Sequence, residues 1–171
     1  MLKHAGMING GNAKMADEKR IKEANKAYKA LCDGIDAIGW TYDRHDNDRI
    51  VTFGVNGEDL PMYFVIGVDA DTQLIRCISR LPVQFETENV AAGAIACAYA
   101  TYRIIDGSFD LDITKGEVQF RINASFADSL ISPELIRYLV GTACNTIDDY
   151  NDGIAAVANG SMTAGEFINK Y

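Results

Sequence analysis

The fold is decided by four consecutive apolar runs: Trp40-Thr-Tyr-Asp-Arg-His45, Arg49-Ile-Val-Thr-Phe-Gly-Val55, Pro61-Met-Tyr-Phe-Val-Ile-Gly-Val68 and Gln73-Leu-Ile-Arg-Cys-Ile-Ser-Arg-Leu81. Each run is rich in β-branched or aromatic residues, which is typical of β-strands. The links between the runs are too short to hold a crossover helix, so neighbouring strands must run antiparallel. This part of the chain therefore predicts a four-stranded meander.

The alternation of side chains predicts where these strands lie in the sheet. In the third run both alternating sets are apolar, which indicates a central strand. In the fourth run Arg76 and Arg80 share a side with Leu74 and Ile78, which indicates a face that is only partly covered. Pro82 is expected to end the sheet run.

Helical periodicity appears in the sequence both before and after the meander. Apolar residues from Ile21 to Ile38 recur at intervals of three and four, which predicts a helix that begins near Asp17 and ends at Gly39. A second helix is expected to begin at Glu86 or Thr87. It contains no charged residue from Val90 to Tyr102, so protein should bury it.

The remaining segments predict a hairpin and two more helices. Residues 109–124 alternate around Lys115-Gly116, with Phe109, Leu111 and Ile113 among those expected to face inward. Ser132-Pro-Glu134 predicts the start of a long helix that ends at Asn159-Gly160. Thr163-Ala-Gly-Glu166 resembles a capping box for a short last helix.

Together these segments predict an α+β fold, in which helices cover an antiparallel six-stranded sheet. The expected order is α-β-β-β-β-α-β-β-α with a short C-terminal helix. Residues 1–15 show no periodicity and are expected to be a flexible N-terminal lead. Residues 16–171 are expected to form a single domain.

Charge restricts the partners of this chain. The net charge of −8 argues against nucleic acid, because phosphate binding needs a basic surface. The charge is uneven, since residues 1–29 carry +4 and residues 30–171 carry −12. A basic first helix on an acidic body fits either a partner site or a solvated helix face. No run of 18 apolar residues occurs, so no membrane span is expected.

The four cysteines indicate the compartment. Cys32, Cys77, Cys97 and Cys144 lie far apart, and three of them have apolar neighbours, as buried reduced cysteines do. In a secreted protein they could form two disulfides. The first ten residues lack the apolar core of a signal peptide, so we expect a cytoplasmic protein with free thiols.

Only one group of residues in the sequence suggests a catalytic or metal-binding site, and the signal is weak. Asp43, His45, Asp46 and Asp48 could form a metal site, but the same residues suit the polar turn of a hairpin. No hydrolase, metalloprotease, calcium-loop or dinucleotide motif is present. We expect no enzyme and no cofactor, and a small enzyme or metal-binding protein that uses this cluster is the alternative.

The pattern resembles the YbjN-type family of small bacterial proteins, whose fold is like that of type III secretion chaperones (Tir-chaperone-like). The likeness covers about residues 17–155. It is carried by the order of elements and by the following segments: Trp40-Thr-Tyr, Leu60-Pro-Met-Tyr-Phe-Val-Ile-Gly-Val68, Leu74-Ile-Arg-Cys-Ile-Ser, Leu81-Pro-Val83, Phe109-Asp-Leu-Asp-Ile113, Glu117-Val-Gln-Phe-Arg-Ile122 and Ser132-Pro-Glu-Leu135. The resemblance implies a small, acidic, dimeric protein that holds an extended segment of a partner protein.

We therefore expect a non-catalytic protein- or peptide-binding module, secretion-chaperone-like or regulatory. An excess of large apolar residues on the first helix and first strands predicts an exposed partner-binding strip. Its residues are Tyr28, Trp40, Tyr42 and Ile50. Ordinary core packing would also explain each of these residues.

The uncharged second helix predicts a homodimer. Its stripe with Ile95 and Tyr102 is expected to face the sheet, which leaves the small residues Gly93, Ala96 and Ala100 for a dimer interface. The alternative is that another helix of the same chain covers the small residues.

Overall fold

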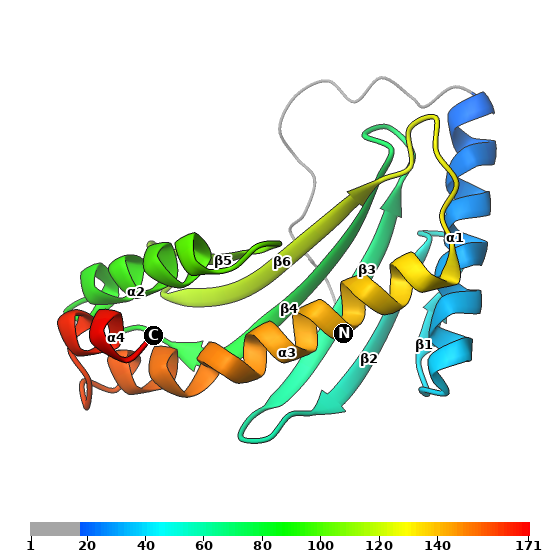
Figure 1. The fold of residues 1–171 in the computed structure, drawn as a ribbon. Helices are drawn as coiled ribbons and strands as arrows, with labels where there is room; N and C mark the ends of the chain where they lie inside the picture. The colour runs from blue at the N-terminus through cyan, green and yellow to red at the C-terminus, as the bar shows by residue number, and fades with distance from the viewer. Residues whose placement is uncertain (1–17) are drawn as a thin grey trace.

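The computed structural model describes residues 18–171 and shows an α+β fold with a six-stranded antiparallel sheet and four helices (Figure 1). The predicted fold class and element order are confirmed. The helices are α1 (Glu18–Ile38), α2 (Val90–Arg103), α3 (Pro133–Ala158) and α4 (Ala164–Lys170). The strands are β1 (Asp43–His45), β2 (Ile50–Asn56), β3 (Pro61–Asp69), β4 (Leu74–Gln84), β5 (Ser108–Asp112) and β6 (Glu117–Ser125). The predicted lead, residues 1–15, lies outside the described residues, so the division into a lead and one domain, 16–171, stays a prediction.

The strand order is β1-β2-β3-β4-β6-β5. The first four strands are therefore a meander, as predicted, and β3 lies in its interior between β2 and β4. The second hairpin joins the sheet through β6, which pairs with β4 and leaves β5 at the far edge. The sheet thus has one edge at β1 and the other at β5.

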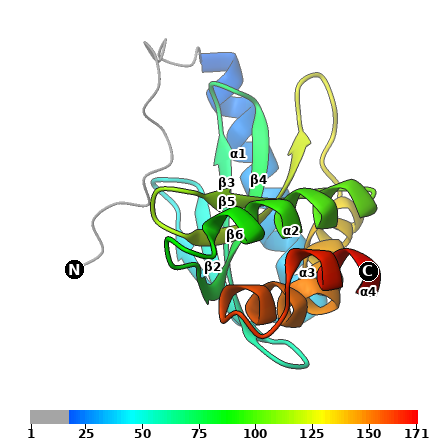
Figure 2. The ribbon, with the colours of Figure 1, turned by 90° about the vertical axis from the view of Figure 1, so that its left-hand side faces the viewer.

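One face of the sheet packs against the helices and holds the core. Val51, Phe53, Phe64 and Ile66 point to this face and are at most 4% exposed. Figures 1 and 2 show α1 and α3 on this side, while α2 runs along β5 and packs on α3 and α4. None of the four helices lies on the opposite face, which we call the open face.

Local signals mark the end of α1 and the starts of α3 and α4 where the sequence predicts them. Gly39 follows α1 with a φ of +81°, a left-handed conformation that glycine adopts without steric cost. The Ser132 hydroxyl caps α3 by accepting a hydrogen bond from the Leu135 N–H. Thr163 and Glu166 form the predicted capping box of α4.

The prediction that Pro82 ends the sheet run is wrong. β4 continues through Pro82 to Gln84, and its register against β6 shifts between Arg80 and Gln84. Such an irregularity lets a strand contain a residue without an N–H donor, because the ladder is interrupted there.

Three element boundaries also differ from the predictions. β1 is only three residues long, because the chain from Trp40 to Tyr42 does not join the ladder. α2 begins at Val90, after a turn over residues 87–89. Ile113 lies beyond the end of β5 and is 67% exposed instead of facing inward.

Candidate binding surfaces

The open face is built from the alternate residues of β2 to β6 that point away from the helices. The register aligns Tyr63, Arg80, Gln119 and Asp110 across four neighbouring strands. Tyr63 is 55% exposed, and Arg80 is exposed beside a half-buried Arg76. The predicted partly covered face of the fourth strand is therefore confirmed. Aromatic, cationic and amide groups share this surface, which suits contacts with another protein.

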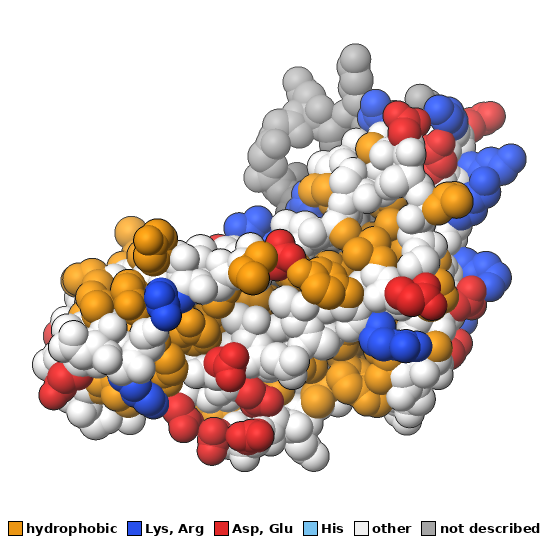
Figure 3. All heavy atoms as spheres, in the orientation of Figure 1, with side chains coloured by type: hydrophobic (Ala, Val, Ile, Leu, Met, Phe, Trp, Pro, Cys, Tyr) orange, Lys and Arg blue, Asp and Glu red, His pale blue; other side chains and the backbone are white. Residues whose placement is uncertain are grey.

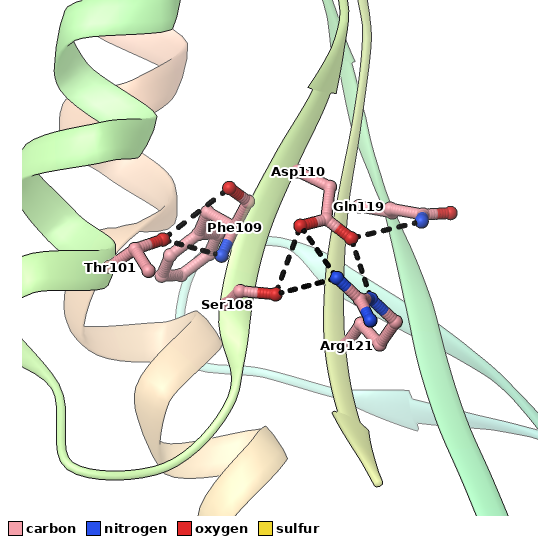
Figure 4. Close-up of polar contacts among 6 residues, drawn as sticks. All are labelled: Thr101, Ser108, Phe109, Asp110, Gln119 and Arg121. Carbon is pink, nitrogen blue, oxygen red and sulfur yellow. Dashed lines mark hydrogen bonds and ion pairs between the residues drawn. The ribbon is translucent and has the colours of Figure 1, made fainter.

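An ion pair stiffens the end of the open face near β5 (Figure 4). Arg121 Nε lies 2.8 Å from Asp110 Oδ2, and the Ser108 hydroxyl donates to Asp110 Oδ1 at 2.9 Å. Burial would raise the pKa of Asp110, but the hydrogen bonds from Arg121 and Ser108 outweigh burial and lower it. Asp110 is thus held ionised and paired, which makes it a poor proton acceptor for catalysis.

α2 covers the β5 edge of the sheet at Phe109. The Thr101 hydroxyl of α2 accepts a hydrogen bond from the Phe109 N–H at 2.9 Å (Figure 4). The same hydroxyl donates to the Phe109 carbonyl at 3.4 Å. Because α2 satisfies both backbone groups, a strand from another protein cannot pair there without displacing the helix.

The other edge of the sheet is incomplete. β1 pairs only with Ile50, Val51 and Thr52, so the second half of β2 has no paired strand on that side among residues 18–171. Gly54 and Asn56 lie in this unpaired part and are exposed. An unpaired strand edge is a template for a strand from another chain.

The four residues of the predicted partner strip gather where α1 leads into β1 and β2. Trp40, Tyr42 and Ile50 are half-buried, and Trp40 contacts Phe53 with ring centroids 5.6 Å apart. Tyr28 is only 7% exposed. They do not form one exposed strip in the free chain, and their contact with a partner stays a prediction.

Tyr28 has a structural role at this junction. Its hydroxyl donates to Asp46 Oδ1 at 2.9 Å, and the Arg44 guanidinium lies 5.7 Å from its ring centroid. Burial, followed by the hydrogen bond to Asp46, raises the pKa of Tyr28 to about 12. These contacts anchor the β1–β2 turn to α1.

The predicted orientation of α2 is wrong. Gly93, Ala96 and Ala100 are buried inside the chain, with both alanines 0% exposed, so they cannot be the surface that meets a second copy. The reason is close packing within the monomer: a Cβ on Gly93 would lie 2.5 Å from the Phe85 ring. Gly93 has no room for a side chain because the backbone of α2 packs directly against the Phe85 ring at this position.

The opposite stripe of α2 faces solvent. Ile95 is 50% exposed and Tyr102 is 81% exposed, while Ile105, just after the helix, is 99% exposed. Ala91 and Ala98 complete this stripe, and Figure 3 shows hydrophobic side chains gathered over α2. The absence of charged residues from Val90 to Tyr102 indicated that α2 has an apolar surface available for a partner. It did not indicate on which side of the helix this surface lies.

The four residues of the alternative metal cluster lie in and beside the β1–β2 turn and are all exposed. They are Asp43, His45, Asp46 and Asp48. The carboxylate of Asp46 already accepts hydrogen bonds from Tyr28 and from Arg44 at 2.8 Å. Within residues 18–171 no three His, Cys, Asp or Glu side chains are grouped closely enough to hold a metal ion.

Two further expectations concern the cysteines and the membrane. All four cysteines are free, as predicted, and burial raises the pKa of the Cys97 thiol to about 12. None of the helices in residues 18–171 is long and apolar enough to cross a bilayer.

Comparison with known proteins identifies the fold. No protein-family model matches the sequence, and no curated protein matches it. A chain in the crystal structure of the ExsC-ExsE complex aligns with a TM-score of 0.55 and 12% identity, over 77% of this chain and 96% of that one. YbjN from E. coli, described as a candidate transcription regulator, aligns with a TM-score of 0.51 and 14% identity, over 74% of this chain and 92% of that one.

The chain has the YbjN-type fold. The expected resemblance, which includes the chaperone-like fold, is therefore confirmed at the level of the fold. At identities of 12% and 14%, the likeness says nothing about particular site residues. In the YbjN-type fold of this chain, the open face, the β1–β2 edge and the outer stripe of α2 are all exposed surfaces.

Proposed function

We propose that this chain is a non-catalytic, secretion-chaperone-like module that binds an extended segment of a partner protein in the cytoplasm. The segment adds as a strand at the β1–β2 edge, beside Trp40 and Tyr42. The fold shared with a chain of the ExsC-ExsE complex supports a binding role. Free thiols fit a cytoplasmic location.

The unpaired part of β2 is the observation that carries this proposal. The Val68 N–H donates to the Arg49 carbonyl at 3.0 Å, so Arg49 directs its backbone groups toward β3. In an antiparallel ladder successive residues alternate in this direction, so Gly54 and Asn56 direct theirs away from β3. β1 begins opposite Thr52, and none of its residues pairs with Gly54 or Asn56. An added strand would satisfy these donors and acceptors.

A pair of substitutions at Gly54 tests the strand edge. A Cβ at this position has only the Met62 carbonyl oxygen near it, at 3.8 Å, so Gly54→Ala fits and keeps the N–H. Gly54→Pro removes the N–H that the added strand would use, and proline is tolerated at sheet edges. The partner is first captured from the native host, and its binding segment is then made as a peptide for titration.

We expect Gly54→Pro to weaken this peptide at least tenfold and Gly54→Ala to leave its affinity unchanged. Hydrogen exchange should show the Gly54 and Asn56 amides becoming protected when the peptide binds. If Gly54→Pro folds and binds with wild-type affinity, the segment does not occupy this edge.

A homodimer through the outer stripe of α2 completes the proposal. Ile95 and Tyr102 belong to an apolar stripe that is exposed to water. In an isologous dimer the same stripe of a second copy would cover it. Ala98 lies at the centre of this stripe and is exposed.

Ala98→Arg would place two like charges against each other at the two-fold axis. We expect the light-scattering mass to fall from that of a dimer to that of a folded monomer. Ala37→Arg, at an exposed alanine of α1, is the matched control and should remain dimeric. A wild-type chain that is monomeric at high micromolar concentration would contradict the dimer and leave the strand-edge proposal intact.

A further inference from the structure

The solvent face of α1 concentrates positive charge on an acidic protein. Residues 18–29 hold five Lys/Arg and two Glu, a net charge of +3, whereas the whole chain carries −8. Figure 3 shows these basic side chains along the side of the molecule that α1 occupies.

Two of these cations have no counter-ion among residues 18–171. Lys22 and Lys26 are exposed, one helical turn apart, and form no ion pair with the described residues. Their neighbours on α1 are engaged, since Lys19 lies 3.7 Å from Glu23 and Lys29 pairs with Asp33. Two adjacent unpaired ammonium groups would both gain from a ligand that supplies carboxylates.

An indentation lies directly beside Lys26. It has a volume of about 290 Å³ and separates α1 from the loop that joins β6 to α3. Ala27 and Phe126, each 3% exposed, contribute its apolar surface. On the loop side Leu130 is 95% exposed and adds an aliphatic side chain to the lining of the indentation.

The charges around this indentation determine the orientation in which a ligand would bind. Glu23 on the α1 side is neutralised by Lys19 and also accepts a hydrogen bond from Gln73 at 2.9 Å. Asp128 on the loop side adds a negative charge. An acidic ligand would therefore turn its carboxylates toward Lys22 and Lys26 and its apolar side chain toward Leu130.

We infer that this indentation and the adjoining lysines of α1 bind an acidic protein segment with an aliphatic side chain. This surface is separate from the β1–β2 edge, so the inference goes beyond the strand addition proposed above. It assigns a second contact, and with it the chemical character of the partner. It also gives a role to the five Lys/Arg that residues 18–29 gather on an acidic chain.

The probe is a fluorescent twelve-residue peptide in which two leucines are flanked by glutamates. We expect it to bind the full chain at low salt and to lose affinity as salt increases, because the contacts are between exposed charges. Lys22→Glu with Lys26→Glu should weaken binding at least tenfold. Leu130→Ser should weaken it several-fold. All of these residues are exposed, so the melting temperature should change little.

The matched control is Lys115→Glu with Lys170→Glu, which changes the net charge equally at exposed sites elsewhere. An equal loss of binding in this control would mean that only net charge matters, which overturns the inference. Unchanged binding in the Lys22/Lys26 variant also overturns it. So does lysine-dependent binding to phosphatidylserine vesicles or to an oligonucleotide without binding of the peptide. Gly54→Pro should leave peptide binding unchanged, so this test is independent of the strand-edge proposal.

Discussion

Gly34 of α1 lies directly against Ile136 of α3, and a Cβ on Gly34 would be 2.7 Å from the Ile136 Cβ. Both residues are buried, and Ile136 is 1% exposed. The two helices can approach this closely because one of them has no side chain at the contact. This contact fixes α1 against α3, and with it the junction that leads to the β1–β2 edge.

Gly34→Ala is therefore expected to destabilise the chain, although alanine favours helices. The propensity gain is at most about 1 kcal/mol, while overpacking a core contact costs about 1–3 kcal/mol. Gly141 in α3 is the matched control, because a Cβ there meets nothing within 4 Å. Gly141→Ala should stabilise the chain by about 0.5–1 kcal/mol. Urea unfolding measures both, and equal stabilisation by both substitutions would contradict a tight Gly34–Ile136 contact.

We expect an apolar substitution at Asn151 to increase the stability of the chain. It lies on the buried face of α3, is 0% exposed, and neither atom of its side-chain amide has a hydrogen-bond partner among residues 18–171. An unsatisfied buried amide costs about 1–3 kcal/mol, and an apolar side chain of similar shape removes that cost. We expect Asn151→Leu to raise the free energy of unfolding by about 1 kcal/mol.

Asn151→Ala is the comparison for this prediction. It removes the amide but leaves a cavity, so it should gain less than leucine or lose stability. A clear loss of stability in Asn151→Leu would show that the amide is satisfied in solution, for example by a buried water.

The Asp110–Arg121 pair predicts a pH dependence of stability. Because the folded chain lowers the pKa of Asp110, this carboxylate contributes stability above its unfolded pKa of about 3.9. The contribution disappears as the pH falls through the lower folded pKa. The Asp110 side chain is 33% exposed, so we expect about 1 kcal/mol or less.

Thermal melts between pH 7 and pH 2 test this prediction. Asp110→Asn should melt below the wild type at pH 7, and the two curves should converge at the acid end. Asp149→Asn removes the same charge at an exposed site of α3 and should follow the wild type throughout. A constant difference between Asp110→Asn and the wild type at all pH values would mean that the ion pair is not its cause.

The binding surfaces were predictable from the sequence only in part. Charge counting found the basic first helix, and the arginines of the fourth run indicated the open face. The unpaired edge at Gly54 was not predictable, because it depends on β1 starting only at Asp43, although the sequence predicts a strand from Trp40. Leu130 carries no signal in the sequence, since a single leucine in a loop is ordinary.

The sequence by itself determined the class and order of the elements, because the signals for them are local. Alternation around Val51 and Phe53 defines a strand, and the Ser132 cap begins a helix whatever surrounds it. Only the tertiary structure decided which side of α2 is buried. A helix without charge has no polar side, so its periodicity does not show which side is buried. In the folded chain Phe85 packs against α2 at Gly93, where no side chain fits, and the stripe of small residues is therefore the buried one.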